Sequence, residues 1–231
     1  MVLPRVGEVW RCGIITKYDK IPFTKLLGTL LIDRVSDTIV VGLITLLIFI
    51  FNFDFFVSFF AKNPALLEGF QKMFDSIWIY VGAVILVVGI WFVFKYMSNF
   101  TLVQKAKALL LNVWDGMKSI WLLKQKGRFV AQTLMIWGGY FCYFYITFYA
   151  FDFTRDLGIT VGLIAFTMSS IGVAVPVQAG IGAWHFMVIA TLVCFGVNEN
   201  DAAAFALVVH TVQTVWTVLC GLFGIVALPL T

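Results

Sequence analysis

Residues 76–94 read SIWIYVGAVILVVGIWFVF, a stretch without a single charged side chain. A helix that crosses the hydrocarbon core of a bilayer needs about 20 mostly apolar residues. The remainder of the chain has the same character, since 61% of its 231 residues are hydrophobic and only 12% are charged. Soluble domains carry about 25% charged residues on average. The composition excludes a soluble globular enzyme, a disordered regulator and a nucleic-acid-binding protein, and it predicts a polytopic membrane protein.

The spacing of apolar segments predicts an all-α membrane helix bundle with about five to six spans or half-spans. The chain is expected to form a single membrane domain over 1–231, with a basic juxtamembrane segment at 1–37 and full spans over 38–60, 76–94, 129–151 and 202–230. The segment 157–198 is uncharged apart from His185 and is about twice as long as one crossing. It must therefore turn within or at the edge of the bilayer, and PVQAGIG at 176–182 is the expected break.

Positive charge orients these spans. Thirteen of the 16 basic residues lie within 1–37 and 95–128, which predicts that both segments are cytoplasmic. The C-terminus is then cytoplasmic as well, in a multi-pass protein of the cell (inner) membrane. Within the second basic segment, 99–124 has apolar and basic residues at helical spacing. This pattern indicates an amphipathic helix that lies in the interface or, alternatively, packs on the cytosolic face of the bundle.

The first group of candidate site residues is the run LIDRVSD at 31–37, which enters a membrane helix. Arg34 and Asp37 are three residues apart and can pair, and one arginine could bridge Asp33 and Asp37. Charge near the hydrocarbon layer marks a candidate site by default. Two readings remain open: an ion pair that neutralises itself and anchors the helix, or an arginine whose guanidinium grips a lipid phosphate with two hydrogen bonds.

The second group is PRVGEVWR at 4–11. Pro4 and Gly7 predict a loop, in which Arg5 and Arg11 flank Glu8 and present positive charge to an anionic group. The alternative is a solvated basic patch that attracts anionic lipids without specificity.

The third group belongs to the expected break and consists of Pro176, Gln178, Gly180, Gly182 and His185. Irregular backbone at membrane depth is tolerated only where it is buried in protein or lines an aqueous cavity. These residues therefore predict a polar path through a broken helix, or else a tight helical hairpin with a buried, hydrogen-bonded histidine. We interpret His210 as a packing residue, and no metal-ligand spacing joins it to His185. We expect no metal and no cofactor.

Together these blocks resemble the lysylphosphatidylglycerol synthase transmembrane-region (flippase-like) family. The resemblance falls on Pro4, Arg5, Gly7, Glu8 and Arg11, then on Gly28, Asp33, Arg34 and Asp37, and finally on Pro176, Gly180, Gly182 and His185. His185 and Asp33 each stand where the family commonly has a glutamate. Because family members usually have further membrane helices before the first block, the resemblance implies an N-terminally truncated chain, without the aminoacyl-transferase domain.

The resemblance implies a membrane protein that binds, and translocates, a lipid with a phosphate headgroup. Its partners would be membrane lipids, either an anionic phospholipid or a polyprenyl-phosphate lipid, with no nucleic acid and with oligomerisation left open. Arg5, Arg11 and Arg34 would bind the phosphate, supported by Glu8, Asp33 and Asp37. Two alternatives stay open: a membrane lipid or glycosyl transferase that uses a polyprenyl-phosphate donor, and a non-transporting accessory subunit. Enzymatic activity is the less favoured reading.

Overall fold

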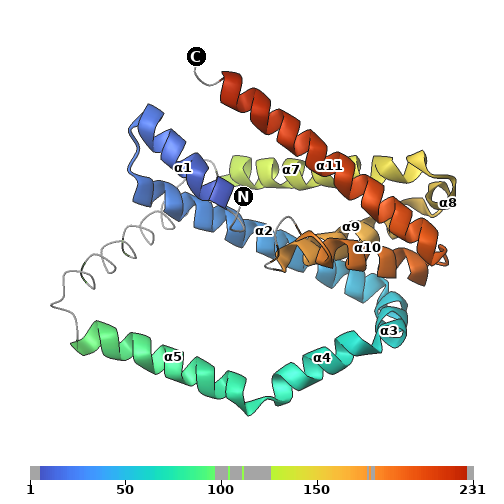
Figure 1. The fold of residues 1–231 in the computed structure, drawn as a ribbon, viewed down its shortest axis with the longest axis horizontal. Helices are drawn as coiled ribbons and strands as arrows, with labels where there is room; N and C mark the ends of the chain where they lie inside the picture. The colour runs from blue at the N-terminus through green and yellow to red at the C-terminus, as the bar shows by residue number, and fades with distance from the viewer. Residues whose placement is uncertain are drawn as a thin grey trace. The chain divides into compact units, whose positions relative to one another are not determined.

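The computed structural model describes residues 6–96, 126–175, 177 and 180–227, together with Gln104 and Leu111. Every regular element in these ranges is a helix, which confirms the predicted all-α class (Figure 1). In chain order the helices are α1 (Val6–Asp19), α2 (Phe23–Phe51), α3 (Phe53–Lys62), α4 (Pro64–Asp75), α5 (Ile77–Tyr96), α7 (Lys126–Ile146), the 3₁₀ helix η1 (Thr147–Ala150), α8 (Asp152–Arg155), α9 (Gly158–Ala174), α10 (Ala183–Cys194) and α11 (Glu199–Ala227).

Three helical stretches of the described chain are long and apolar enough to cross a membrane: Phe23–Phe51, Lys126–Ala150 and Glu199–Gly224. Helices α9 and α10 are also apolar but shorter. Large apolar side chains are exposed along all three stretches, among them Leu47, Met135 and Phe223. Apolar surface on this scale is unfavourable in water and is matched by lipid tails. The protein is therefore a multi-pass membrane helix bundle.

The chain forms two compact units. The first contains Met1–Gly42 and Phe60–Thr133, and the second contains Leu43–Phe59 and Leu134–Thr231. One boundary between the units falls inside α2, so this helix contributes Phe23–Gly42 to one unit and Leu43–Phe51 to the other.

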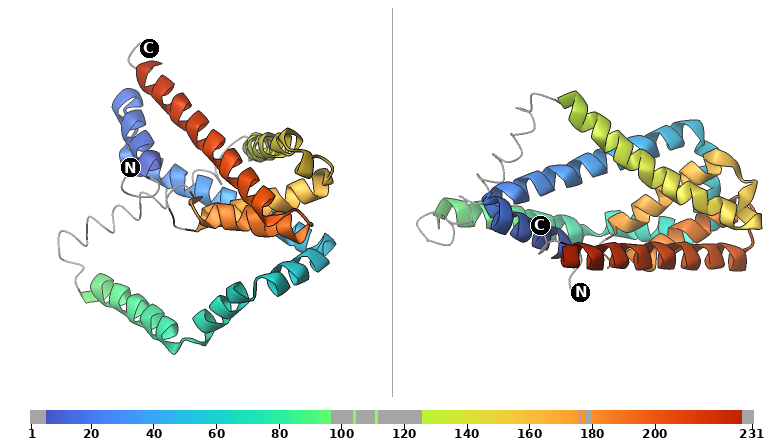
Figure 2. Two further views of the ribbon diagram at one scale, coloured as in Figure 1. Left: turned by 45° about the vertical axis from the view of Figure 1, so that its right-hand side comes forward. Right: turned by 90° about the horizontal axis from the view of Figure 1, so that it is seen from above.

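An aromatic core holds the second unit together. The ring of Phe144 on α7 lies 5.7–6.4 Å, centroid to centroid, from the rings of Phe148, Phe166, Trp184 and Phe205. Most of these pairs meet edge to face, an arrangement that aromatic quadrupoles favour. Helix α10 packs against both α9 and α11 (Figure 2). On α11 the buried face comprises Ala202, Phe205, Ala206 and Val209, which follow helical spacing.

The predicted break is confirmed by the end of α9 at Ala174 and the start of α10 at Ala183. Gly180 and Gly182 have φ angles of +71° and +87°, a left-handed conformation that glycine adopts without steric cost. Pro176 and Gln178 lie outside the described residues.

Two other predictions concern residues 4–11 and 99–124. The loop predicted over 4–11 is wrong from residue 6 onward, because α1 begins at Val6. Pro4 precedes the helix, a glycine costs little in a first turn, and Glu8 in that turn complements the helix dipole. The amphipathic helix expected over 99–124 lies outside the described residues, except for Gln104 and Leu111.

The packing of α9 on α10 generates a stability prediction at Gly172. A Cβ atom at this position would lie 2.8 Å from Trp184 Cα and 2.9 Å from the Ala183 carbonyl oxygen, which are backbone atoms that cannot rotate away. We expect Gly172→Ala to lower the free energy of unfolding by about 1–3 kcal/mol. Unfolding of the purified protein by SDS in mixed micelles, followed by circular dichroism, measures this change.

Gly138→Ala on α7 is the matched control, because nothing lies within 4 Å of its added Cβ. Alanine is the better helix former, so this variant is expected to gain about 0.5–1 kcal/mol. Equal stability of the two variants would contradict the close approach of α9 and α10.

Candidate functional site

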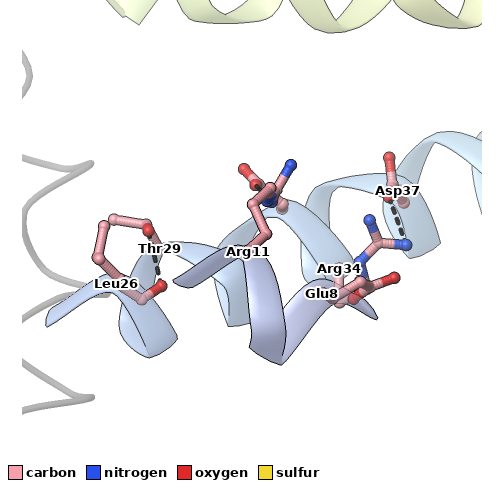
Figure 3. A network of polar contacts seen from close by, with 7 residues as sticks. Glu8, Arg11, Leu26, Thr29, Arg34 and Asp37 are labelled. Atoms are coloured by element: carbon pink, nitrogen blue, oxygen red, sulfur yellow. Dashed lines mark hydrogen bonds and ion pairs between the residues drawn. The ribbon is translucent and has the colours of Figure 1, made fainter. Parts of the chain in front are cut away.

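Five charged side chains gather between α1 and α2, and we call them the arginine–carboxylate cluster: Glu8 and Arg11 from α1, and Asp33, Arg34 and Asp37 from α2 (Figure 3). A short turn at Lys20–Pro22 connects the two helices, with Lys20 in a left-handed conformation at φ 56°. The Pro22 carbonyl accepts hydrogen bonds from the Lys25 and Leu26 amides and begins α2. The turn thus brings the second and first candidate groups of the sequence together.

The pairing in the cluster runs mainly between the two helices. Arg34 Nε lies 3.5 Å from Glu8 Oε2 on α1, and Arg34 Nη1 lies 3.2 Å from Asp37 Oδ2 on its own helix. Arg11 Nη2 lies 3.8 Å from Asp33 Oδ2. Asp33 therefore pairs with α1 instead of sharing Arg34 with Asp37. The sequence predicted the Arg34–Asp37 pair correctly but held no information on the two pairs between helices.

The two arginines differ in how firmly they are held. Arg34 has a carboxylate on each side, and its Nε is shielded from solvent and makes no hydrogen bond. Arg11 has one pairing, at a distance too long for a hydrogen bond, and 58% of its side chain is exposed. Arg11 is consequently the more accessible cation. Arg5, the third predicted phosphate ligand, lies outside the described residues.

The length of α2 places the cluster near the edge of the hydrocarbon layer. A helix of 29 residues is roughly 43 Å long, which exceeds the roughly 30 Å thickness of the hydrocarbon core. The charged residues of α2 all lie before residue 38, and the uncharged remainder, 38–51, extends roughly 21 Å. The polar half of α2 is thus suited to the headgroup region and the apolar half to the core.

A second polar feature lies beside the broken helix, in the second unit. His185 belongs to the first turn of α10, and its ring centroid lies 4.5 Å from that of His210 on α11. His185 Nδ1 is shielded from solvent without a hydrogen-bond partner, so the hydrogen-bonded histidine of the hairpin alternative is not realised at this atom. The contact was missed from the sequence, because nothing in the local spacing brings together two residues on separate helices.

A shallow depression of about 330 Å³ also lies in the second unit, where α2 gives way to α3. Asp54 and Asn52 are its most polar lining residues, and Phe55 stacks on Phe195 across it at 5.5 Å. It includes none of the predicted site residues.

The structure is that of a multi-pass membrane protein. It combines long apolar helices with a broken helix and with charged side chains paired at the end of a span. The family described as "Lysylphosphatidylglycerol synthase TM region" matches residues 1–221. The chain belongs to this family, and the resemblance identified in the sequence is confirmed. No curated protein and no solved structure matches the chain.

The unequal pairing of the two arginines predicts unequal coupling energies. In double-mutant cycles, we expect the Arg34→Gln and Glu8→Gln pair to couple by about 1–2 kcal/mol, because both side chains are partly shielded. The exposed Arg11→Gln and Asp33→Asn pair should couple by less than about 1 kcal/mol. SDS unfolding of the single and double variants measures both cycles. A stronger coupling for Arg11 would contradict the assignment of Arg34 as the firmly held arginine.

Proposed function

We propose that this protein binds a lipid with a phosphate headgroup at the arginine–carboxylate cluster and moves it between the two leaflets. The lipid is an anionic phospholipid or a polyprenyl-phosphate lipid. One observation carries the proposal: α1 and α2 hold two guanidinium groups at the polar end of an apolar span, each paired within the described chain with carboxylates that a phosphate can replace.

Exchange of ion partners provides the binding step. A phosphate offers the same paired oxygen acceptors as a carboxylate, so it competes directly for the guanidinium fork. Arg11 is the first contact, because it is exposed and its pairing with Asp33 is loose. The released Asp33 is 47% exposed and returns to water at little cost. Arg34 accounts for a second contact, in which a phosphate oxygen replaces the Glu8 carboxylate that lies 3.5 Å from its Nε.

Charge balance assigns a role to Arg5. In the cluster, Glu8, Asp33 and Asp37 contribute −3 and the two arginines +2, which leaves −1. A third guanidinium from Arg5 brings the sum to zero before an anion arrives. In this proposal Arg5 offsets the −1 that the five other side chains leave, and the carboxylates keep each arginine neutralised in a low-dielectric setting when no lipid is bound.

The broken helix supports the translocation step. Helix α9 ends at Ala174 and α10 begins at Ala183, and such an interruption at membrane depth is tolerated where it is buried in protein or lines an aqueous cavity. Discontinuous helices form the midplane sites of many transporters. Gly180, Gly182 and His185, with Pro176 and Gln178, would form the polar path of the headgroup. The excess of basic residues supports a cytoplasmic N-terminal segment and C-terminus in the cell (inner) membrane.

The transferase alternative finds less support in the geometry. It would need Glu8, Asp33 or Asp37 to accept a proton from an acceptor substrate. Each of these carboxylates is paired with an arginine, so a proton from an acceptor substrate would have to compete with a guanidinium for its oxygens.

A vesicle assay tests the proposal. Purified protein is reconstituted with fluorescent NBD-labelled phosphatidylglycerol, and dithionite quenching reports the lipid that reaches the outer leaflet. We expect Arg34→Ala to slow exchange at least tenfold, because the phosphate loses a charge-assisted contact. The exchange rate of Arg34→Lys should lie between those of the unmodified protein and Arg34→Ala, since lysine keeps the charge but lacks the planar guanidinium fork.

Arg155→Ala is the matched control, because Arg155 pairs with Asp152 at 3.4 Å and has a similarly exposed side chain, but lies on α8. Its exchange rate should equal that of the unmodified protein. NBD-labelled glucosylceramide, which has no phosphate, should not be moved faster than in empty vesicles. Lipid binding without any leaflet exchange in the unmodified protein would instead identify a non-transporting accessory subunit.

A further inference from the structure

Helix α4 has exposed apolar side chains on one side and charged side chains on the other. Leu67 and Phe74 are 46% and 62% exposed, and they lie two turns apart on the same side of the helix, with Leu66 beside them. The charged residues of the helix fall within an arc of about 60° on the opposite side: Glu68, Lys72 and Asp75. The helix is therefore amphipathic, and its apolar side requires an apolar environment.

Length and charge exclude a membrane crossing by α4. Its 12 residues extend roughly 18 Å, well short of the roughly 30 Å hydrocarbon core. A crossing would also bury its three charged side chains in hydrocarbon. Water on every side is unfavourable as well, because Leu67 and Phe74 would stay hydrated. The boundary between headgroups and acyl chains offers an apolar medium on one side and a polar medium on the other, which matches this helix.

The start of α5 indicates the depth of α4. Ser76 alone separates the two helices, and its extended backbone (φ −76°, ψ 104°) turns the chain (Figure 1). Helix α5 is roughly 30 Å long, and its one charged residue, Lys95, lies in its last turn, as expected for a crossing. Trp78 and Tyr80, in its first turn, are 78% and 53% exposed. Exposed Trp and Tyr at the end of an apolar helix mark the headgroup level, and α4 ends directly before them.

Continuity of the apolar surface favours lipid over a protein partner. Exposed apolar side chains continue from Phe74 of α4 to Ile77 and Trp78 of α5, and the surroundings of a membrane span are acyl chains. The charge of α4 then indicates how the lipid is held. One lysine against two acids gives the helix a charge of −1, so anionic headgroups do not attract it. Attachment must therefore depend on apolar contact.

We propose that α4 is an interfacial helix, which binds the bilayer surface through Leu66, Leu67 and Phe74 and holds the start of α5 at the headgroup level. The partner is a lipid surface, and the attachment is independent of anionic lipid and of salt. The distribution of basic residues assigns this surface to the non-cytoplasmic leaflet. The attachment does not depend on whether lipid is moved by way of the arginine–carboxylate cluster, which belongs to α1 and α2.

Nitroxide labels on the full-length protein test this position. Each label is coupled to p-acetylphenylalanine, so the four cysteines stay unmodified. Single labels are placed at 67 and 74 on the apolar side and at 68 and 72 on the polar side, in phosphatidylcholine vesicles. Electron paramagnetic resonance measures collisions with oxygen, which concentrates in acyl chains, and with a nickel chelate, which stays in water. We expect the oxygen-to-nickel collision ratio to be at least about threefold higher on the apolar side.

Matched controls separate lipid contact from other effects. Met135 of α7 is the reference for lipid surroundings, because it is 75% exposed within a long apolar stretch. Phosphatidylglycerol or salt added to the vesicles should leave the ratios unchanged. Phe74→Gln should lower the ratio at 67 roughly twofold, because it removes apolar area from the contact. Lys72→Gln, on the 80% exposed polar side, should leave that ratio unchanged.

Three outcomes would overturn the proposal. Equal ratios on both sides, with the nickel chelate reaching each label, would place α4 in water. Exclusion of both reagents from 67 and 74 would show a protein cover, such as a second copy of the chain. A contrast that arises only with anionic lipid would replace apolar attachment by electrostatic attraction. The measurement uses only labelled but otherwise unmodified chains, so it can be judged even if Phe74→Gln misfolds, and it is independent of the leaflet-exchange assay.

Discussion

The free-energy cost of an unpaired charge in hydrocarbon is the constraint on which this structure depends. Only 12% of the residues are charged, and the three that directly precede the apolar half of α2 are all paired. Arg34 lies between Glu8 and Asp37, and Arg11 lies opposite Asp33. Removing one partner would leave the other as an isolated ion, so α1 and the first half of α2 must remain together.

The sequence predicted those features of the fold that depend on runs of neighbouring residues. Uncharged stretches predicted the long helices, and Gly180 and Gly182 within PVQAGIG predicted the break. Prediction from the sequence failed where a feature depends on a contact between separate helices. Gly7 suggested a loop, but a glycine in a first turn costs little once Glu8 follows it and pairs with Arg34. The contact between His185 and His210 joins separate helices, and no local periodicity reports it.

The arginines stay charged at every physiological pH, so they need permanent carboxylate partners, and the cluster supplies them. A permanently charged pair suits the end of a span better than its middle, because the cost of a charge is highest at the centre of the hydrocarbon layer.

Tight pairing alone would make a poor binding site. An arginine held by two carboxylates in ideal geometry would gain nothing by exchanging either of them for a phosphate. In this cluster the contacts lie between 3.2 and 3.8 Å, and the loosest belongs to the most exposed guanidinium. Arg11 can therefore exchange its carboxylate for a phosphate more readily than Arg34, which lies between Glu8 and Asp37. The cluster thus combines an accessible cation, which makes the first contact, with a more firmly held one.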